Sequence, residues 1–319
     1  VWANTDRLFN WMLRQLPFIR KDFTDIRSDE YPIRLWTVAV FLFGALPLLH
    51  KRGISRLVIG DEYDTTIRAN YKGISHYDGL YDQSRHFDNA MSRFFLSKGW
   101  SIAQFSILRP LSELLIEKVL VERYPHLQEQ QLSCHAAHKK EDRIHPCGKC
   151  EKCRRIVGML SALGADPKRC GYSEEQIQRS LKLLSEKGVH QESAGQQQML
   201  FMLRDKEIIK VRKRIKEHPE VLHLRIDPER SPLENIPVDL RRPLFELLLK
   251  HAAGALIRKG RSWQSFDILN DSCLLNAYPF DAPSEEISPK GLSGQPLSGP
   301  KAEYILGELT WPEAEEYLK

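Results

Sequence analysis

The sequence predicts an α/β protein that contains a parallel sheet, a cysteine-rich loop and a mainly helical C-terminal region. The first observation is that helical patterns alternate with short β-branched strands over the first half of the chain. The second is that a glycine and an acidic loop follow the strand at 55–60, as in one unit of a parallel α/β sheet. The third is a group of four cysteines at metal-ligand spacing, which closes this half of the chain.

The composition is that of an ordinary globular chain of 319 residues, with 42% hydrophobic and 28% charged residues. The net charge of +5 suits an anionic ligand such as a nucleotide, whereas a nucleic-acid partner would need a concentrated basic face. Four of the six cysteines fall within twenty residues, which argues against a disulfide framework and predicts a reducing, cytoplasmic compartment. The apolar stretch 35–50 is too short to span a bilayer, so we expect a buried helix and no membrane partner.

The pattern divides the chain into an α/β domain over 1–172 and an accessory region over 173–280. In the α/β domain we expect helices at 6–19, 35–49, 84–100, 111–124 and 153–163, and strands at 55–60 and 101–108. Ser112 should cap the helix that follows it, and Ser173 and Gln176 form a capping box at the start of the accessory region. Later elements are expected at 196–218 (a basic helix), 221–227 (a strand), 241–260 (a helix), 281–301 (a flexible linker) and 302–319 (a C-terminal helix).

The cysteine loop spans 134–153 and carries the most specific motif of the sequence, C-x12-C-x2-C-x2-C. Two-residue gaps let neighbouring thiolates turn onto one ion, and Gly148 permits the tight backbone that this needs. The ligands are expected to be Cys134, Cys147, Cys150 and Cys153. Four thiolates form a closed tetrahedral site, so the spacing favours structural zinc rather than a catalytic centre.

Three alternatives to a four-cysteine zinc site stay open at this point. An iron–sulfur cluster uses similar C-x2-C spacing. A histidine from the same loop would replace one cysteine in a mixed site, the candidates being His135, His138 and His145. The thiols would otherwise carry no metal. Cys170 and Cys273 stand alone in the sequence and are expected to be ordinary semi-buried cysteines.

The cysteine loop and its surroundings resemble a known enzyme family. The segment SC, a short histidine-bearing loop and CGKCEKCRR at the start of a helix are similar to the zinc loop of 7-cyano-7-deazaguanine synthases. These enzymes belong to the PP-loop ATP pyrophosphatase superfamily. The strand SIAQFSIL followed by RPLSELLIEKVL, and the segment LVIGDEYD, fit the same family pattern. The resemblance covers roughly 50–165 and is most specific in the cysteine loop.

The resemblance implies a Rossmann-like parallel sheet that binds ATP with magnesium. Such enzymes adenylate a substrate, often at a carboxylate, release pyrophosphate, and displace AMP with a nucleophile. In the synthases the substrate is a 7-carboxy-7-deazaguanine, so a small, nucleobase-like substrate is expected. Relatives in the superfamily modify tRNA or are thought to conjugate a deazaguanine to protein, which keeps RNA and protein substrates open.

One feature of the family pattern is absent from this sequence. The superfamily binds ATP phosphates with an S-G-G-x-D-S loop after its first strand, and these 319 residues contain no Ser-Gly-Gly. We expect that loop, and the first strand, upstream of Val1 or on a second chain. The alternative is a non-catalytic, zinc-stabilised module that binds a nucleotide, an RNA or a partner protein.

Ligands of parallel α/β proteins bind beyond the carboxyl ends of the strands, which directs attention to the loop after 55–60. The main candidates for nucleotide or substrate binding are Gly60, Asp61, Asp64, Asp82 and Arg154. Carboxylates of the acidic loop would bind magnesium or a ribose, and Arg154 would meet an anion at the start of its helix. Further candidates are Arg34, Glu62, Tyr77, Asp78, Tyr81, Arg85 and Arg155, together with an RNA-contacting face on 204–216. For each of these the alternative is an ordinary solvated surface residue.

Overall fold

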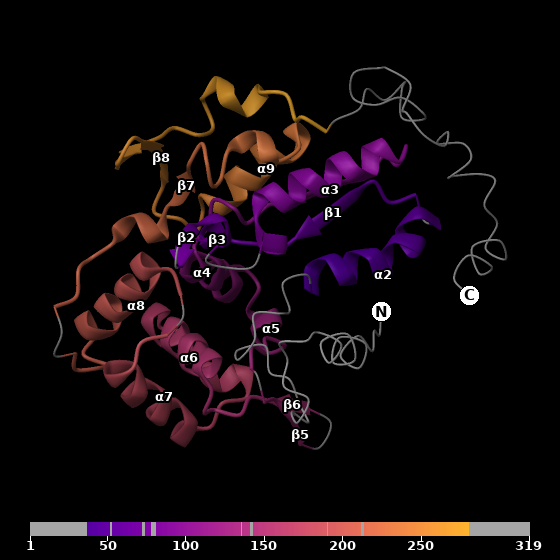
Figure 1. Ribbon diagram of the computed structural model, residues 1–319. Coiled ribbons are helices and arrows are strands. Elements are labelled where there is room, and N and C mark those ends of the chain that lie inside the picture. Colours follow the sequence, from indigo (N-terminus) through magenta and orange to yellow (C-terminus); the bar gives the residue numbers. More distant parts are fainter. Residues whose placement is uncertain are drawn as a thin grey trace.

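The computed structural model describes residues 37–280, apart from 52, 72–73, 78–80, 135, 141–142, 190 and 212–213. The segments predicted at 6–19, 281–301 and 302–319, and Arg34, lie outside the described residues. Figure 1 shows α4 (Glu113–Arg123) between two groups of elements, one made of helices and the other built around a small sheet. The helical group contains α6 (Glu151–Leu163), α7 (Glu174–Glu186) and α8 (Ser193–Asp205).

The N-terminal part of the described chain alternates helices and strands, as predicted. Its main elements are α2 (Thr37–Lys51), β1 (Arg56–Ile59), α3 (Arg85–Ser97) and β4 (Ala103–Ser106). Strands β1 and β4 pair in parallel, with Leu57 opposite Gln104 and Val58 opposite Phe105. The α/β class is therefore confirmed, whereas the larger Rossmann-like sheet stays a prediction because this sheet has two strands within the described residues.

Helix ends follow the capping side chains that the sequence provides. Ser112 Oγ accepts a hydrogen bond from the Leu115 N–H (3.0 Å), which confirms the predicted start of α4. Ser173 and Gln176 form the predicted capping box at the start of α7. Helix α6 ends at Gly164, whose φ of 79° is the left-handed conformation that glycine adopts without strain.

Helix α4 belongs to two hydrophobic cores because both of its sides are covered. Leu114 packs with residues of α6, α7 and α8. Leu115 and Val119 pack instead with β7 (Leu224–Ile226) and α9 (Val238–Leu248). A helix that is covered on two sides carries apolar residues around most of its circumference. The two cores therefore meet at α4, immediately ahead of the cysteine loop.

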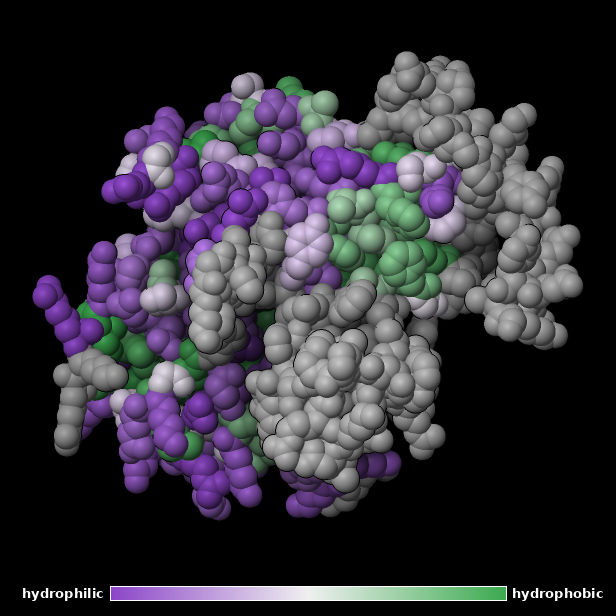
Figure 2. All heavy atoms as spheres, in the orientation of Figure 1, coloured by the Kyte–Doolittle hydropathy of each residue, from purple (hydrophilic) through white to green (hydrophobic). Residues whose placement is uncertain are grey.

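Helix α2 was predicted to be buried, and this prediction is wrong for its outer face. Leu42 and Leu46 pack against α3, but Phe43 is 48% exposed and meets Phe94 edge to face at 6.1 Å. Figure 2 shows the resulting hydrophobic patch over α2 and the adjoining end of α3. None of the helices in the described residues is both long enough and apolar enough to cross a membrane.

The basic helix predicted at 196–218 ends early, at Asp205. The Ile208 N–H donates to the Leu203 carbonyl (2.9 Å) and the Glu207 N–H donates to Arg204 (2.9 Å). This pair of bonds is a Schellman motif, with Glu207 in the left-handed conformation at φ 57°. Because glycine usually occupies that position, the sequence contains no stop signal here, and the RNA-contacting helix face predicted at 204–216 does not form.

The helix predicted at 241–260 is also wrong in its second half. Helix α9 ends at Leu248, and the chain continues as β8 (Ala255–Lys259) and β9 (Ser262–Ser265). Strand β8 pairs in parallel with β7 and antiparallel with β9. Pairing with a strand some thirty residues earlier decides this outcome, which local periodicity does not report. The accessory region 173–280 is thus less helical than predicted.

Two short hairpins were not predicted from the sequence. One joins β2 (Arg68–Tyr71) to β3 (Ile74–Tyr77), between the acidic loop and α3. The other joins β5 (His138–Lys140) to β6 (Arg143–His145), inside the cysteine loop. Both hairpins use strands of three or four residues, too short for a clear alternating pattern.

Candidate metal centre and the carboxyl edge of the parallel strands

The four predicted cysteines converge on one point. Their sulfur atoms all lie within 4.8 Å of one another. Three of the sulfur–sulfur distances are 3.8 Å for Cys147–Cys153, 3.9 Å for Cys134–Cys150 and 3.5 Å for Cys150–Cys153. Four sulfurs placed about 2.3 Å from a central ion form a tetrahedron with edges of about 3.8 Å. The cluster is therefore compatible with a single metal ion.

The backbone of the loop is arranged to favour thiolates at this site. The Cys147 N–H points at Cys134 Sγ (3.2 Å), and the N–H groups of Lys149 and Cys150 point at Cys147 Sγ (3.4 Å each). Such N–H donors stabilise the negative charge that a metal-bound sulfur carries. The hairpin β5–β6 brings Cys134 back to Cys147 so that these bonds can form.

Gly148 is required in this loop for two reasons. Its φ of 64° is left-handed, and a Cβ at this position would overlap the side chain of Gln176. Gln176 completes the capping box of α7 and donates from Nε2 to the Pro146 carbonyl (3.4 Å). The start of α7 therefore packs directly on the cysteine loop, which ties the helical group to the metal site.

Two histidines of the loop, His138 and His145, are not members of the ligand cluster. The rings of His138 and His145 face each other across the hairpin with centroids 6.2 Å apart. Within the described part of the loop, the cluster of ligand atoms is made of the four cysteines alone. His135 lies outside the described residues. In an iron–sulfur cluster each thiolate binds a different iron or shares one of two, whereas these sulfurs surround one common point.

The second feature of the site is the edge where β1 and β4 end. Ser106 Oγ donates to the Asp61 carbonyl (2.7 Å), and the Tyr63 N–H donates to the Leu111 carbonyl (2.9 Å). The loop after β1 thus lies against the loop after β4, as expected for two parallel strands. Gly60 is exposed at this edge, and a Cβ there would only touch Leu108 at 3.9 Å, so its position does not demand glycine.

Asp61 is engaged inside the protein by a residue that sequence reasoning missed. Arg109 is 1% exposed, and its Nη2 lies 2.7 Å from Asp88 and 3.4 Å from Asp61. Its Nη1 donates to Thr65 Oγ1 (2.5 Å) and to the Gln83 carbonyl (2.7 Å). Burial raises the pKa of Asp61 to about 7 despite the attraction of Arg109. The position of Arg109 directly after a strand was the signal available in the sequence.

Asp82 is also engaged, in capping a helix. Its Oδ2 accepts a hydrogen bond from the Val38 N–H at the start of α2 (2.8 Å), and the residue is 1% exposed. Tyr81, beside it, is 48% exposed and meets Phe87 edge to face. The side chains of Tyr77 and Asp78 lie outside the described residues. The structure therefore places Asp82 in a supporting position.

Glu62, Asp64 and Glu113 form a crowded acidic group at the same edge. Burial, followed by repulsion from Asp64 and Glu113, raises the pKa of Glu62 to about 8. Burial raises the pKa of Glu113 to about 7, although the Arg155 guanidinium lies 3.3 Å away and lowers it. Burial and then Glu192 raise the pKa of Asp64. With these pKa values Glu62 and Glu113 exchange protons near neutral pH, as acid–base residues do.

The metal centre and the acidic group are connected through α6. Cys153 lies in the first turn of this helix, and Arg155, two residues later, makes the ion pair with Glu113. The predicted anion-binding residue was Arg154, which is half-buried with an Nε that has no hydrogen-bond partner within the described residues. Glu113 was not predicted as a site residue. An acidic residue in the first turn of a helix commonly stabilises the helix dipole, and this explained its presence.

A buried ion pair lies behind the acidic group. Arg225 on β7 is 1% exposed, and its two Nη atoms donate to Glu192 at 2.7 and 2.8 Å. Its guanidinium also stacks on the ring of Tyr63 at 3.8 Å. The accessory region is thereby fixed to the loop after β1. Neither Arg225 nor Glu192 carries a motif, so only the fold brings them to the site.

A titration test separates the buried carboxyl groups of this region from surface ones. Glu117 on α4 is 4% exposed, and burial raises its pKa to about 7. Since the unfolded carboxyl ionises near pH 4.3, this group stabilises the fold at low pH and loses that contribution as pH rises towards 7. Glu117→Gln should therefore be more stable than the wild type at pH 8, by on the order of 2 kcal/mol, and closer to it at pH 5.

The measurement is urea unfolding of both proteins across that pH range. The Gln131 Nε2 donor, 2.7 Å from Glu117, keeps an acceptor in the glutamine variant. The exposed Glu186→Gln on α7 is the control, and its difference from the wild type should not change with pH. A Glu117→Gln difference that is also independent of pH would show that Glu117 is ionised in the folded protein.

Comparisons with known proteins find no family model that matches this chain, no matching curated protein and no matching solved structure.

Proposed function

We propose that this chain is the zinc-binding part of an ATP-dependent ligase of the deazaguanine-synthase type. In such a reaction a substrate, often a carboxylate, is adenylated with release of pyrophosphate, and a nucleophile then displaces AMP. The observation that carries the proposal is the connection from the cysteine cluster through Arg155 to Glu113, at the carboxyl edge of β1 and β4. Ligands of parallel α/β proteins bind at that edge.

The donor set and its dimensions fit zinc. Four thiolates, with three of their sulfur separations at 3.5–3.9 Å and all of them within 4.8 Å, are compatible with a tetrahedral zinc site, which leaves no coordination position for a substrate. The role proposed for the metal is therefore structural. It would hold the first turn of α6 so that Arg155 meets Glu113 in a fixed geometry.

Glu62, Asp64 and Glu113 are the residues proposed to act at the edge. Bound magnesium and ATP would supply an activated phosphate and charge neutralisation, and Glu62 and Asp64 are the carboxylates that would hold the cation. Glu113, with a pKa of about 7, is suited to take a proton from an attacking nucleophile. Asp61 and Asp82 are assigned to support, because Arg109 and α2 engage them.

The ATP phosphates would be bound by a segment outside this sequence, since no Ser-Gly-Gly is present. One observation agrees with a completing segment or chain. Val58 and Phe105 are register partners on the same face of the sheet. Tyr278 covers Phe105, which is 2% exposed, but Val58 is 55% exposed. Parallel sheets are normally covered on both faces, so this face of β1 suits further packing.

The test measures AMP and pyrophosphate formed from ATP and magnesium, with 7-carboxy-7-deazaguanine as the probe substrate. The chain is assayed alone and together with the polypeptide encoded directly upstream. Activity is expected in at least one arm, and Glu113→Gln should lower turnover about a hundredfold, whereas Glu186→Gln should not change it. Absence of AMP in both arms would overturn the ligase proposal.

A non-catalytic, zinc-stabilised binding module is the second candidate. The observation that favours it is that Asp61 and Asp82, both predicted as ligand residues, are used inside the protein instead. Such a module would bind a nucleobase-like molecule, an RNA or a partner protein at the same edge. If the chain instead modifies tRNA or conjugates a deazaguanine to protein, it would form AMP, which a non-catalytic module would not.

A further inference from the structure

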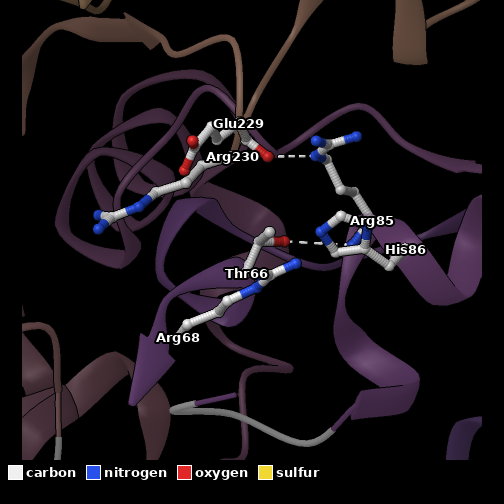
Figure 3. Close-up of a pocket in the computed structure, with 6 residues that line it drawn as sticks. All are labelled: Thr66, Arg68, Arg85, His86, Glu229 and Arg230. Carbon is white, nitrogen blue, oxygen red and sulfur yellow. Dashed lines mark hydrogen bonds between the residues drawn. The ribbon is translucent and has the colours of Figure 1, made fainter. Parts of the chain in front are cut away.

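A cleft with strongly basic walls lies beside the acidic edge. Its volume is about 270 Å³, which is below the usual range for drug-sized ligands. Figure 3 shows the six residues that line it, which come from three separate parts of the chain. They are Thr66 and Arg68 from η1 (Tyr63–Thr66) and β2, Arg85 and His86 from α3, and Glu229 and Arg230 from the loop after β7.

The described residues that line this cleft are mostly basic. Three of them carry a guanidinium group, one carries an imidazole, and Glu229 carries a carboxylate. In Figure 3, Arg68 and Arg85 extend on either side of His86, while Arg230 turns towards the other side of the cleft. Arg230 Nη1 lies 3.4 Å from the Tyr63 hydroxyl. The groups that face the cleft together are therefore Arg68, Arg85 and His86.

Hydrogen bonds join the walls of the cleft to one another and hold the loop that carries Glu229 and Arg230. The Arg85 N–H donates to Thr66 Oγ1 (3.1 Å), and Arg85 Nε donates to the Glu229 carbonyl. Asp227 Oδ1 accepts the N–H groups of Glu229 (2.8 Å) and Arg230 (3.2 Å). A binding site whose walls are already ordered loses less entropy when a ligand enters.

The position of the cleft adds to its attraction for anions. Arg85 and His86 are the first two residues of α3, a helix of 13 residues capped by Ser84. The N-terminus of such a helix carries a partial positive charge and attracts phosphate groups. The pKa of His86 is lowered by burial and then by Arg85, Arg68 and Arg109, while Glu229 acts in the opposite direction. Burial, and after it the neighbouring guanidinium groups, therefore oppose protonation of the imidazole.

We propose that this cleft binds a phosphate oxyanion carried by a small molecule, with Arg68, Arg85 and His86 as the binding groups. Guanidinium groups match phosphate oxygens in geometry as well as charge, and a small cleft admits a phosphate or pyrophosphate group. Because Arg68 belongs to β2 whereas Arg85 and His86 belong to α3, an anion here would also bridge β2 to α3. The proposal concerns binding alone and stands whether or not the chain is a ligase.

The test is isothermal titration of the chain with inorganic phosphate, pyrophosphate and AMP, with a single-stranded RNA oligonucleotide as a separate arm. Arg68→Gln and Arg85→Gln should each weaken phosphate or pyrophosphate binding about tenfold to a hundredfold, as expected for a lost charge-assisted hydrogen bond. The matched control is Arg93→Gln, which removes the same charge from an exposed position of the same helix and should leave affinity unchanged.

A second readout does not depend on the fold of the variants. In the wild type, pyrophosphate should raise the pKa of His86 in a histidine NMR titration, because a nearby anion favours the imidazolium. The proposal would be overturned if all three arginine variants weakened phosphate binding equally and the pKa of His86 did not change when pyrophosphate was added. Binding would then depend on the general surface charge and not on this cleft. Binding of the oligonucleotide without binding of phosphate, pyrophosphate or AMP would overturn it in favour of RNA, and binding of none of the probes would refute it.

Discussion

Replacement of Cys153 by serine is expected to abolish metal binding and to lower the midpoint of thermal unfolding by roughly 10 °C or more. Cys153 is fully buried in the core that holds α6, α7 and α8. Structural zinc contributes directly to folding free energy, and a hydroxyl is a much poorer zinc ligand than a thiolate. The loop also orders the start of α7 through Gln176, so loss of the metal should reach beyond the loop.

Metal content measured on protein purified without chelator checks this expectation together with thermal unfolding. The wild type should contain one zinc per chain. Cys273→Ser is the matched control because Cys273 is half-buried and lies outside the cluster, so this variant should keep its zinc. If the wild type contains iron and no zinc, the metal is iron and the zinc assignment is wrong. A wild-type protein that contains no metal at all would contradict the assignment of a metal site. Unchanged metal content in Cys153→Ser would show that other ligands hold the ion.

Replacement of Arg109 by methionine is expected to destabilise the protein by about 3–5 kcal/mol, the cost of leaving a buried charge without its partner. Arg109 is the common partner of Asp61 and Asp88 and also orders Thr65. Methionine fills part of the space but supplies no charge and no hydrogen bond. The loops after β1 and β4 should loosen together, which would also weaken any ligand binding at that edge.

Urea unfolding measures this effect, and the control is the same substitution at an exposed ion pair. Arg56 lies 2.8 Å from Asp239, a distance close to that of Arg109 and Asp88, but both side chains are largely in solvent. Arg56→Met should therefore cost less than about 1 kcal/mol. Adding Asp88→Asn to Arg109→Met should recover part of the lost stability, since it removes one unpaired charge. Equal costs at the two sites would contradict the central role of Arg109.

The metal ligands could be predicted from the sequence because the short spacing between the cysteines largely determines where their sulfur atoms can lie. Two-residue gaps and the left-handed Gly148 leave few ways to arrange the cysteines, and the structure brings all four together. Helix starts were equally predictable, since Ser112 and Ser173 each accept a hydrogen bond from an N–H group only three residues away. In each case the interaction that decides the structure is local.

The candidate binding residues at the strand edge were predicted less well. The acidic loop was found because parallel strands present their carboxyl ends together, yet which of its carboxylates face a ligand depended on distant partners. Arg109 engages Asp61 from 48 residues away, and α2 engages Asp82 from 44 residues away. No periodicity or spacing reports such contacts. The sequence therefore predicted the acidic loop at this edge, but it did not reveal that Asp61 and Asp82 have partners inside the protein.

By itself, the sequence determined the α/β class, the cysteine cluster and most helix starts, because each of these depends on residues that are neighbours along the chain. The tertiary structure alone decided that 255–259 is a strand and that the basic helix stops at Asp205. It also decided that Arg68, Arg85 and His86 surround one cleft. These outcomes depend on pairing and burial between segments far apart in sequence, where the energy of contact overrides local propensity.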